Sequence, residues 1–376
     1  FNKKRTNKKK KSYKKKKSYK KNKSYKKNKS YKKNKSLRQK VMIGGMQAVQ
    51  PPALLDNPRG RDLSIEDGSK KVLERLGIKR PYVRHMFPLK VSGQLHLMQG
   101  ITLRVLVRAL VHMGLAEIRE IILKNNETFD FSPLEELPKL ESLVITNYQR
   151  HSQWENCLIN LESLNDLRSI LTLSLQYNNI EYNDLRSLFV RGLNLQRLNL
   201  ANNKIQDISP LSEAKALLEL NLAGNQISDI SPLAILSNLR LLILNRNNRI
   251  VDIHPLSKLK DLQRLHLNEN TNIDWTQLES GFDRLDHLEL NQTGITDLTC
   301  LKPLNLFSLS LNGNNIDNIS VMGKLPGFSL LRHLSMSNNN ITDITPIDNV
   351  DKLEYLNLEH NNITDVSILH DYFQLK

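Results

Sequence analysis

The sequence predicts an α/β solenoid, in which a short parallel strand and a turn recur along most of the chain. Three observations predict it. The pattern LxxLxLxxNxIxDISPL, or a close variant, starts eleven times, at spacings of mostly 21 to 25 residues. Within each copy, the LxL alternation places two leucines on one face of a strand and the intervening residue on the other. The first copy starts at Ile118 and the last at Leu353, so the copies follow one another over most of the chain.

The net charge of +17 arises from the N-terminal segment. Residues 1–40 hold 20 Lys and 2 Arg with no acidic residue, a charge of +22. Residues 41–116 hold 11 basic and 5 acidic residues (+6), and residues 117–376 hold 22 basic and 33 acidic residues (−11). The basic balance therefore describes a tail, while the predicted repeat domain is acidic.

The tail, residues 1–40, repeats units such as SYKKNK, with tyrosines six residues apart from Tyr13 to Tyr31. These units hold no apolar side chain except tyrosine, and their like charges repel, so the tail is predicted to be disordered. Such a polyelectrolyte can neutralise phosphates on a nucleic acid or an anionic membrane surface. Two alternatives stay open: a solvated tail without a partner, or an extension that precedes a start at Met42 or Met46.

Two segments connect the tail to the repeats. Residues 41–66 are predicted to be a linker, because Gly-Gly, Pro-Pro and Asn-Pro interrupt any regular period. Residues 67–116 are predicted to form a helical N-terminal cap, starting with a short helix that Ser69 can cap. A second helix is predicted from about Thr102 to Met113, where apolar residues recur three and four apart. Its apolar side is expected to cover the end of the solenoid.

Cysteine usage and hydropathy suggest a location. Cys157 and Cys300 are the two cysteines, and neither belongs to a CxxC pair, which fits a reducing compartment. No apolar run reaches the length of a membrane span, and no apolar stretch follows the N-terminal lysines as in a secretory signal. A cytoplasmic location is therefore expected, although the chain begins at Phe1 rather than Met, which leaves an upstream segment open.

The repeated pattern resembles the leucine-rich repeat family, in its short class of about 22 residues, as found in the protein phosphatase regulatory subunit and in internalin-like repeats. The resemblance covers roughly residues 117–369 and rests on eleven copies. It implies a right-handed, horseshoe-shaped solenoid with a concave parallel sheet and short 3-10 or extended segments on the convex side. Residues 117–376 are accordingly predicted to form the repeat domain. The residues do not decide between the phosphatase-subunit and internalin branches.

Two polar positions of the repeat are predicted to be structural. The Asn after each strand can donate to and accept from backbone groups where the chain turns, and the following Asp can cap the next turn. The expected asparagine ladder comprises Asn126, Asn178, Asn203, Asn225, Asn247, Asn270, Asn314, Asn339 and Asn361. Tyr148 and Thr293 replace Asn in two copies, so their turns are expected to differ. The expected caps are Asp207, Asp229, Asp252, Asp297, Asp343 and Asp365.

Binding residues are expected at the outward strand positions, because the leucines and the ladder asparagines are needed by the fold. Most outward positions are small and polar, but Leu241 and Ile243 form an apolar spot. By register, Arg264 is expected beside His287 and His266 beside Glu289, about 5 Å apart. An apolar spot rimmed by Arg and His is typical of an interface hot spot. The predicted partner-binding residues are Tyr177, Arg197, Leu241, Ile243, Arg246, Arg264, His266, Glu269, His287, Glu289, His333 and Tyr355.

The predicted function is that of a non-enzymatic scaffold, which binds a protein partner on the concave face of the solenoid. The sequence holds no metal-ligand spacing, phosphate loop or nucleophile elbow, so no catalytic, cofactor-binding or metal-binding residue is expected. Two alternatives stay open. The tail could bind a nucleic acid or an anionic surface, or the repeats could be the recognition arm of a larger enzyme.

Overall fold

The computed structural model describes residues 89–92, 103–112, 117–124, 130–146, 161–190, 192–324, 326–350 and 352–371. All of them belong to one unit, Leu63–Lys376. The predicted tail, the linker and the short helix at Ser69 lie outside the described residues.

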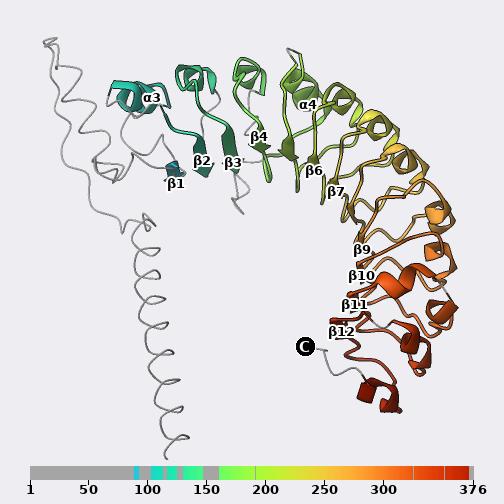
Figure 1. Ribbon diagram of the computed structural model, residues 1–376. Helices are drawn as coiled ribbons and strands as arrows, with labels where there is room; N and C mark the ends of the chain where they lie inside the picture. The colour runs from blue at the N-terminus through green and yellow to red at the C-terminus, as the bar shows by residue number, and fades with distance from the viewer. Residues whose placement is uncertain are drawn as a thin grey trace, which may run out of the picture. The chain divides into compact units, whose positions relative to one another are not determined.

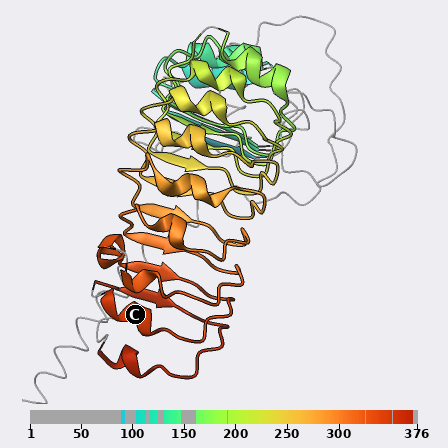
Figure 2. The same ribbon diagram turned by 90° about the vertical axis from the view of Figure 1, so that its right-hand side faces the viewer.

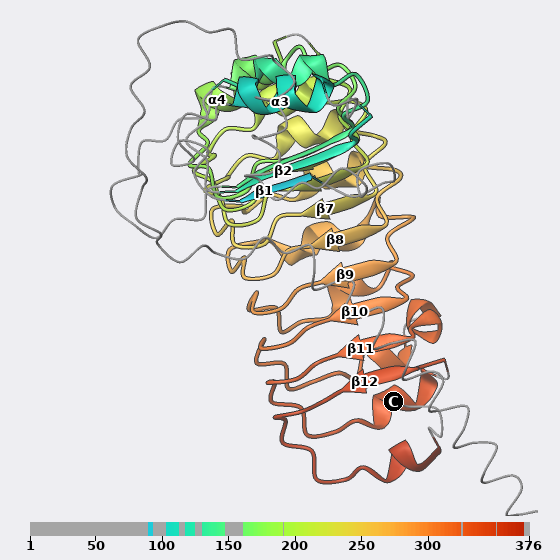
Figure 3. The same cartoon turned by 90° about the vertical axis from the view of Figure 1, so that its left-hand side faces the viewer.

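Twelve parallel strands form one sheet, in which each strand pairs with the next along the chain (Figure 1). The eleven predicted repeats supply β2 to β12, and β1 adds a strand N-terminal to the first repeat. Figure 3 shows the strands stacked in chain order. The strands are β1 (Leu89–Ser92), β2 (Glu120–Lys124), β3 (Ser142–Thr146), β4 (Thr172–Ser174), β5 (Arg197–Asn199), β6 (Glu219–Asn221), β7 (Leu241–Ile243), β8 (Arg264–His266), β9 (His287–Glu289), β10 (Ser308–Ser310), β11 (His333–Ser335) and β12 (Tyr355–Asn357).

Short helices cover the convex side of the repeat arc, and the strands line its concave side (Figures 1 and 2). This arrangement confirms the predicted solenoid. The α-helices are α3 (Leu103–His112) and α4 (Tyr182–Leu188). The 3-10 helices are η4 (Ser132–Glu136), η6 (Leu161–Leu164), η7 (Ser209–Glu213), η8 (Ser231–Ile235), η9 (His254–Lys258), η10 (Trp275–Glu279), η11 (Thr299–Leu301), η12 (Met322–Lys324), η13 (Pro326–Leu330), η14 (Thr345–Asn349) and η15 (Ser367–Asp371).

The helix predicted from about Thr102 to Met113 is α3, which packs against η4. Leu106, Val107 and Leu110 lie on its buried side and are fully enclosed. The apolar residues recur three and four apart because that spacing places them on one face of a helix. α3 therefore buries apolar surface at the N-terminal end of the described repeats.

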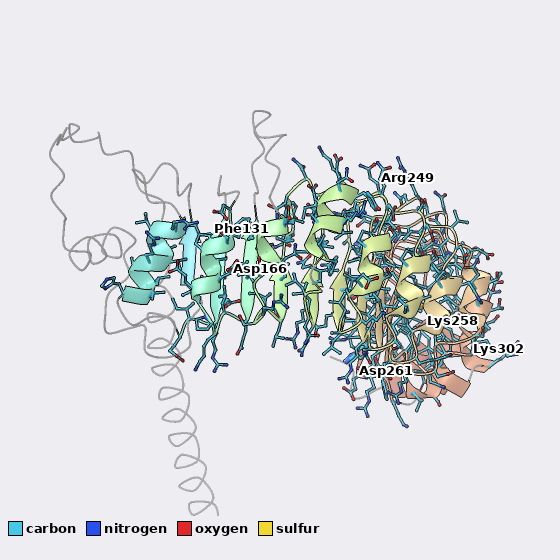
Figure 4. The ribbon with its side chains drawn as sticks, turned by 90° about the horizontal axis from the view of Figure 1, so that it is seen from above. Phe131, Asp166, Arg249, Lys258, Asp261 and Lys302 are labelled. Atoms are coloured by element: carbon cyan, nitrogen blue, oxygen red, sulfur yellow. The ribbon has the colours of Figure 1, made fainter. Side chains whose placement is uncertain are left out.

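The core lies between the sheet and the convex helices. Each LxL strand sends its two leucines inward, and Leu198, Leu220 and Leu242 on successive strands are at most 2% exposed. Phe131, which comes just before η4, is also fully buried (Figure 4). Burying one such side chain stabilises the fold by about 2 kcal/mol. A single repeat cannot enclose its own apolar residues, so each coil depends on its neighbours.

The predicted aspartate caps are confirmed. Asp207 Oδ1 accepts a hydrogen bond from the backbone N–H of Ser209 at 2.7 Å, which fixes the chain as it enters η7. The same bond recurs at Asp229, Asp252, Asp297, Asp343 and Asp365. At Asp297 the backbone donor holds the pKa of the carboxyl below its usual value. A short acidic side chain is suited to this position because it reaches the N–H two residues on.

The asparagine ladder joins each coil to both neighbours, as Asn247 illustrates. Its Nδ2 donates to the carbonyl of Leu244 in its own repeat and to that of Leu222 in the preceding repeat, each at 3.0 Å. Its Oδ1 accepts from Ile227 N at 3.2 Å, and its own N–H donates to Asn270 Oδ1 at 2.7 Å. The side chain is fully buried. One amide therefore satisfies backbone groups that no strand partner reaches.

Equivalent bonds confirm the other predicted ladder residues that the structure describes, which are Asn178, Asn203, Asn225, Asn270, Asn314, Asn339 and Asn361. Asn126 and Tyr148 lie outside the described residues. Thr293 differs as expected: its hydroxyl donates to Leu290 O within its own repeat at 2.9 Å. A hydroxyl has one proton, so Thr293 cannot also donate to the preceding repeat.

The residue before each ladder position adopts a left-handed backbone conformation, with φ between 55° and 70° from Tyr177 to His360. Glycine and asparagine tolerate this conformation, and they occupy it at Asn202, Gly224, Gly313 and Asn338. Other residues occupy it at Tyr177, Arg246, Glu269, Gln292 and His360. Each of these side chains costs about 1 kcal/mol relative to glycine in this conformation.

Replacing Asn247 by Ala is expected to lower the free energy of unfolding by roughly 2 kcal/mol or more, because two carbonyls and one N–H lose a buried partner. Urea denaturation followed by circular dichroism measures the loss. Asn248→Ala is the matched control, since Asn248 is exposed beside it. Equal stability of the two variants would contradict a structural role for the ladder.

Gln292→Asn is expected to raise the free energy of unfolding by about 0.5 kcal/mol or more, since asparagine relieves the left-handed strain. Gln263→Asn makes the same change where φ is not positive, and no gain is expected there. Both are compared by urea denaturation. A gain at both positions, or at neither, would show that the backbone conformation is not the cause.

Candidate interaction surface

Strands β7, β8 and β9 place the central predicted residues in three adjacent rows on the concave face. Leu241 pairs in register with Arg264, which pairs with His287. Ile243 likewise pairs with His266, which pairs with Glu289. Both predicted neighbouring pairs, Arg264 with His287 and His266 with Glu289, are therefore in register as expected. The LxL alternation places these residues outward because the leucines between them face the core.

Leu241 and Ile243 make β7 apolar on its outward face, and both are half-buried. In register with them on β6 lie Glu219 and Asn221. On β8 the neighbours are Arg264 and His266. The apolar spot is thus one strand wide and bordered on both sides by polar residues. That arrangement is common at the centre of protein interfaces.

His266 lies between Ile243 and Glu289 and is partly buried. Burial lowers the pKa of its imidazole, and this effect outweighs the attraction of Glu289, whose Oε2 lies 3.5 Å from Nδ1. Arg264 and His287 lower the pKa of His266 further. The same Glu289 oxygen accepts from Asn268 Nδ2 at 2.7 Å. The pKa of His266 is therefore lowered in spite of the nearby carboxylate, and an amide holds Glu289 in place.

Two of the predicted arginines are paired with an acid in the next repeat. Arg197 Nε lies 3.2 Å from Glu219 Oε1. Arg246 Nε donates to Glu269 Oε2 at 2.8 Å, and this bond raises the pKa of Arg246. Because both pairs are exposed, each contributes little to stability. They fix the direction of the side chains along the concave face and its rim.

Arg264 differs from these two arginines. It is exposed, and no acidic group in the described part of the chain lies within 4.0 Å of its guanidinium. Arg240, which directly precedes β7, is also exposed and has no such acid among the described residues. Its backbone carbonyl accepts from the N–H groups of Gln263 and Arg264, so the two arginines belong to adjacent coils. The sequence interpretation did not include Arg240.

The remaining predicted residues lie outside the β7 to β9 rows. His333 and Tyr355 stack on β11 and β12, with ring centroids 6.3 Å apart. Tyr177 belongs to the coil of β4, yet its hydroxyl contributes to the raised pKa of Arg246. Small residues, Asn202 and Gly224, occupy the equivalent positions of the two coils between them. Tyr177 therefore lies outside the central rows, and His333 and Tyr355 form a separate pair.

Sequence interpretation missed a second apolar spot near the N-terminal end of the sheet. Ile122 on β2 and Val144 on β3 are in register, point outward and are half-buried. The sequence did indicate this spot. Both residues occupy the middle position of an LxL-like triplet, and this middle position is polar in most copies. No charged residue that the sequence analysis selected lies on these two strands.

The outward asparagines form a second ladder on the concave surface. Asn245 Oδ1 accepts from Asn268 N at 2.9 Å, and Asn268 Oδ1 accepts from Asn291 N at 2.8 Å. The series continues from Asn291 to Asn312 and then to Ser337. On β5, β6 and β12 an asparagine instead accepts from the N–H two residues on within its own coil. These asparagines therefore bind backbone groups and are not free contact residues.

The hydrogen-bond pattern of this second ladder changes at the coil of β7. Before it, on β5 and β6, the asparagine bonds within its own coil, and from Asn245 to Asn312 it bonds to the next coil. Asn221 bonds within its own coil and does not reach Asn245, and Ile243 offers no acceptor. Among the described residues, the backbone N–H of Asn245 therefore has no hydrogen-bond acceptor, unlike its equivalents Ala201, Ala223, Asn268 and Asn291. An unmatched donor thus lies directly after Ile243.

No group of three or more His, Cys, Asp or Glu side chains among the described residues could hold a metal ion. In the same part of the chain, no helix has the length and apolar character of a membrane span. The Cys300 thiol is buried and donates to the carbonyl of Asp297 at 3.5 Å, and Cys157 lies outside the described residues.

Comparison with known proteins places the repeats in a family. A family model described as Leucine Rich repeats (2 copies) matches residues 193–234 and 329–370. A search of curated proteins finds no match. Among solved structures, an internalin of Listeria monocytogenes, inlF, is 26% identical with a TM-score of 0.50, and the match covers 84% of this chain and 80% of that chain.

Two further structures are similar. Internalin C2 of Listeria monocytogenes is 31% identical with a TM-score of 0.44, over 51% of this chain and 82% of that one. A leucine-rich repeat protein of Leptospira interrogans is 20% identical with a TM-score of 0.41, over 74% of this chain and 85% of that one. The family model and the inlF structure both support a leucine-rich repeat fold. The chain is a leucine-rich repeat protein, built on a fold that serves in general as a scaffold for protein interactions.

Proposed function

We propose that this protein is a non-enzymatic scaffold that binds a protein partner on the concave face, with the contact centred on β7, β8 and β9. The observation that carries the proposal is the outward pair Leu241 and Ile243. Along the rest of the sheet from β5 to β12, the outward middle position holds Asn, His, Glu or Ser. A partner that covers the apolar pair gains roughly 25 cal/mol for each Å² of apolar surface removed from water.

The strained residues support the same location. Arg246 and Glu269 both take the left-handed conformation, directly beside β7 and β8, although Gly or Asn serves there in the coils of β5, β6, β10 and β11. Their ion pair is exposed and offsets little of that strain. Strain that the fold does not require is more often found where a side chain has a function. These residues therefore extend the proposed contact from the strands to the rim.

Binding suits this surface better than catalysis. His266 and Glu289 are adjacent, but they lie on an open sheet that does not enclose a substrate. Their contact of 3.5 Å is long for a proton-transfer hydrogen bond. Glu289 is also engaged by Asn268, which holds the carboxylate in place. The pair is consistent with a polar border around the apolar spot.

A second candidate function rests on the charge of +22 in residues 1–40. This tail could bind a nucleic acid or an anionic surface without using the repeats. Because such binding releases counterions, its affinity falls steeply as salt rises. Titrating an RNA oligonucleotide at several salt concentrations, with and without residues 1–40, separates this function from binding by the concave face.

Replacing the apolar pair by polar residues of neighbouring coils tests the favoured function. Leu241→Ser with Ile243→Asn reproduces residues found on β10 and β6, so the fold is expected to persist. Affinity capture from an extract, with mass spectrometry, identifies proteins retained by the wild type. We expect the double variant to bind such a partner at least about 10-fold more weakly, a loss of about 1.4 kcal/mol.

The control makes the same kind of change on another face. Ile235 in η8 is 50% exposed on the convex side, and Ile235→Asn is expected to leave capture unchanged. Circular dichroism and the urea midpoint check that both variants fold. Unchanged capture by a folded double variant would exclude β7 as the centre of the contact.

A further inference from the structure

We propose that the segment bound at β7 and β8 is an extended peptide that carries an apolar side chain next to a carboxylate. This inference rests on the proposed function and adds the chemistry of the partner. Leu241 and Ile243 supply the apolar contact, and Arg264 supplies the positive charge. The N–H of Asn245 supplies a donor at the end of the same strand.

Arg264 can bind a negatively charged group of the partner. The repeat domain is acidic, with 33 acidic and 22 basic residues between 117 and 376. In such a domain most exposed arginines of the concave face find an acid in the next coil, as Arg197 and Arg246 do. Arg264 is flanked instead by Leu241 on β7 and His287 on β9. Its guanidinium is therefore available to a carboxylate from outside, which it can bind through two parallel hydrogen bonds.

The backbone N–H of Asn245 can donate a hydrogen bond to the partner. In the coils of β5, β6 and β8 to β12, an asparagine oxygen accepts the N–H at the position of Asn245. At β7 Ile243 replaces the residue that would have carried such an oxygen within the coil. A peptide carbonyl or carboxylate of the partner can take its place. The residue that creates the apolar spot thus also leaves the donor open.

The acidic residue on the neighbouring strand favours a peptide over a nucleic acid. A polyanion laid across the strands would meet Glu289 on β9, the strand next to that of Arg264. Repeated phosphates would therefore be repelled there. One carboxylate at Arg264 avoids Glu289, and the apolar pair next to it suits an aliphatic or aromatic side chain. The arrangement favours an acidic, partly apolar peptide.

Selection from random linear peptides displayed on phage tests the inference directly, with the full chain as bait. We expect the selected peptides to pair an aliphatic or aromatic residue with an adjacent Asp or Glu. Binding of a synthetic selected peptide is then measured by calorimetry. Arg264→Gln is expected to weaken it at least about 10-fold, and to remove most of its salt dependence.

The matched control is Arg249→Gln, which removes the same charge in the coil of β7. Arg249 is exposed and lies at the edge of the repeat arc (Figure 4). This variant is expected to bind the peptide as the wild type does. A peptide in which Gln replaces the acidic residue should lose the difference between wild type and Arg264→Gln.

The outcomes separate the inference from the proposed function. Selected peptides without acidic residues, or equal binding by wild type and Arg264→Gln, would overturn the inference while leaving a protein contact at β7. Displacement of the peptide by an RNA oligonucleotide, in a chain lacking residues 1–40, would also overturn it. If no selected peptide distinguishes the wild type from Leu241→Ser with Ile243→Asn, the proposed function fails as well.

Discussion

The buried asparagine amide is the interaction on which the rest of the structure depends. A solenoid turns its backbone away from the sheet once in every coil, and the carbonyls at that turn have no strand partner. Asn247 satisfies two of them, one in its own coil and one in the coil before, while its oxygen serves the N–H of Ile227. Because the same side chain connects consecutive coils, it sets their spacing as well as their hydrogen bonding. The strand register, and therefore the rows of side chains on the concave face, follow from that spacing.

This constraint also decides where recognition can occur. Leucines fill the core, the ladder asparagines hold the turns, and the aspartates hold the entry to the convex helices, so only the outward positions of each coil remain open. The second ladder takes one of these outward positions in most coils, because Asn268, Asn291 and Asn312 use their oxygens for backbone N–H groups. The coil of β7 is exceptional, since Ile243 ends one version of this ladder before Asn245 begins the other. The apolar surface and the open donor therefore have one local cause, and Arg264, which has no acidic partner among the described residues, lies on the next strand.

Much of this could be predicted from the sequence, because residue types that recur at a fixed spacing report the coil directly. The strands β2 to β12, the first ladder and the register of Arg264 with His287 all follow from that recurrence. β1 could not be found, since LKVS carries no part of the repeat pattern. The role of Asn245 could not be found either, because an asparagine oxygen can reach its own coil or the next one, and geometry decides between them.

Specificity in such a fold arises from differences between adjacent coils. Arg197, Arg246 and Arg264 are exposed cations on or beside the strands of one sheet, and their chemistry differs only through what the next coil places beside them. Glu219 and Glu269 neutralise the first two, whereas His287 leaves the third without an acid. His266 shows the same principle, since burial lowers the pKa of its imidazole even with Glu289 in contact. On a concave face where Arg197 and Arg246 each pair with a glutamate, Arg264 is distinct because it has no acidic partner among the described residues. One coil can therefore acquire a binding function without any change in the bonds that hold the solenoid together.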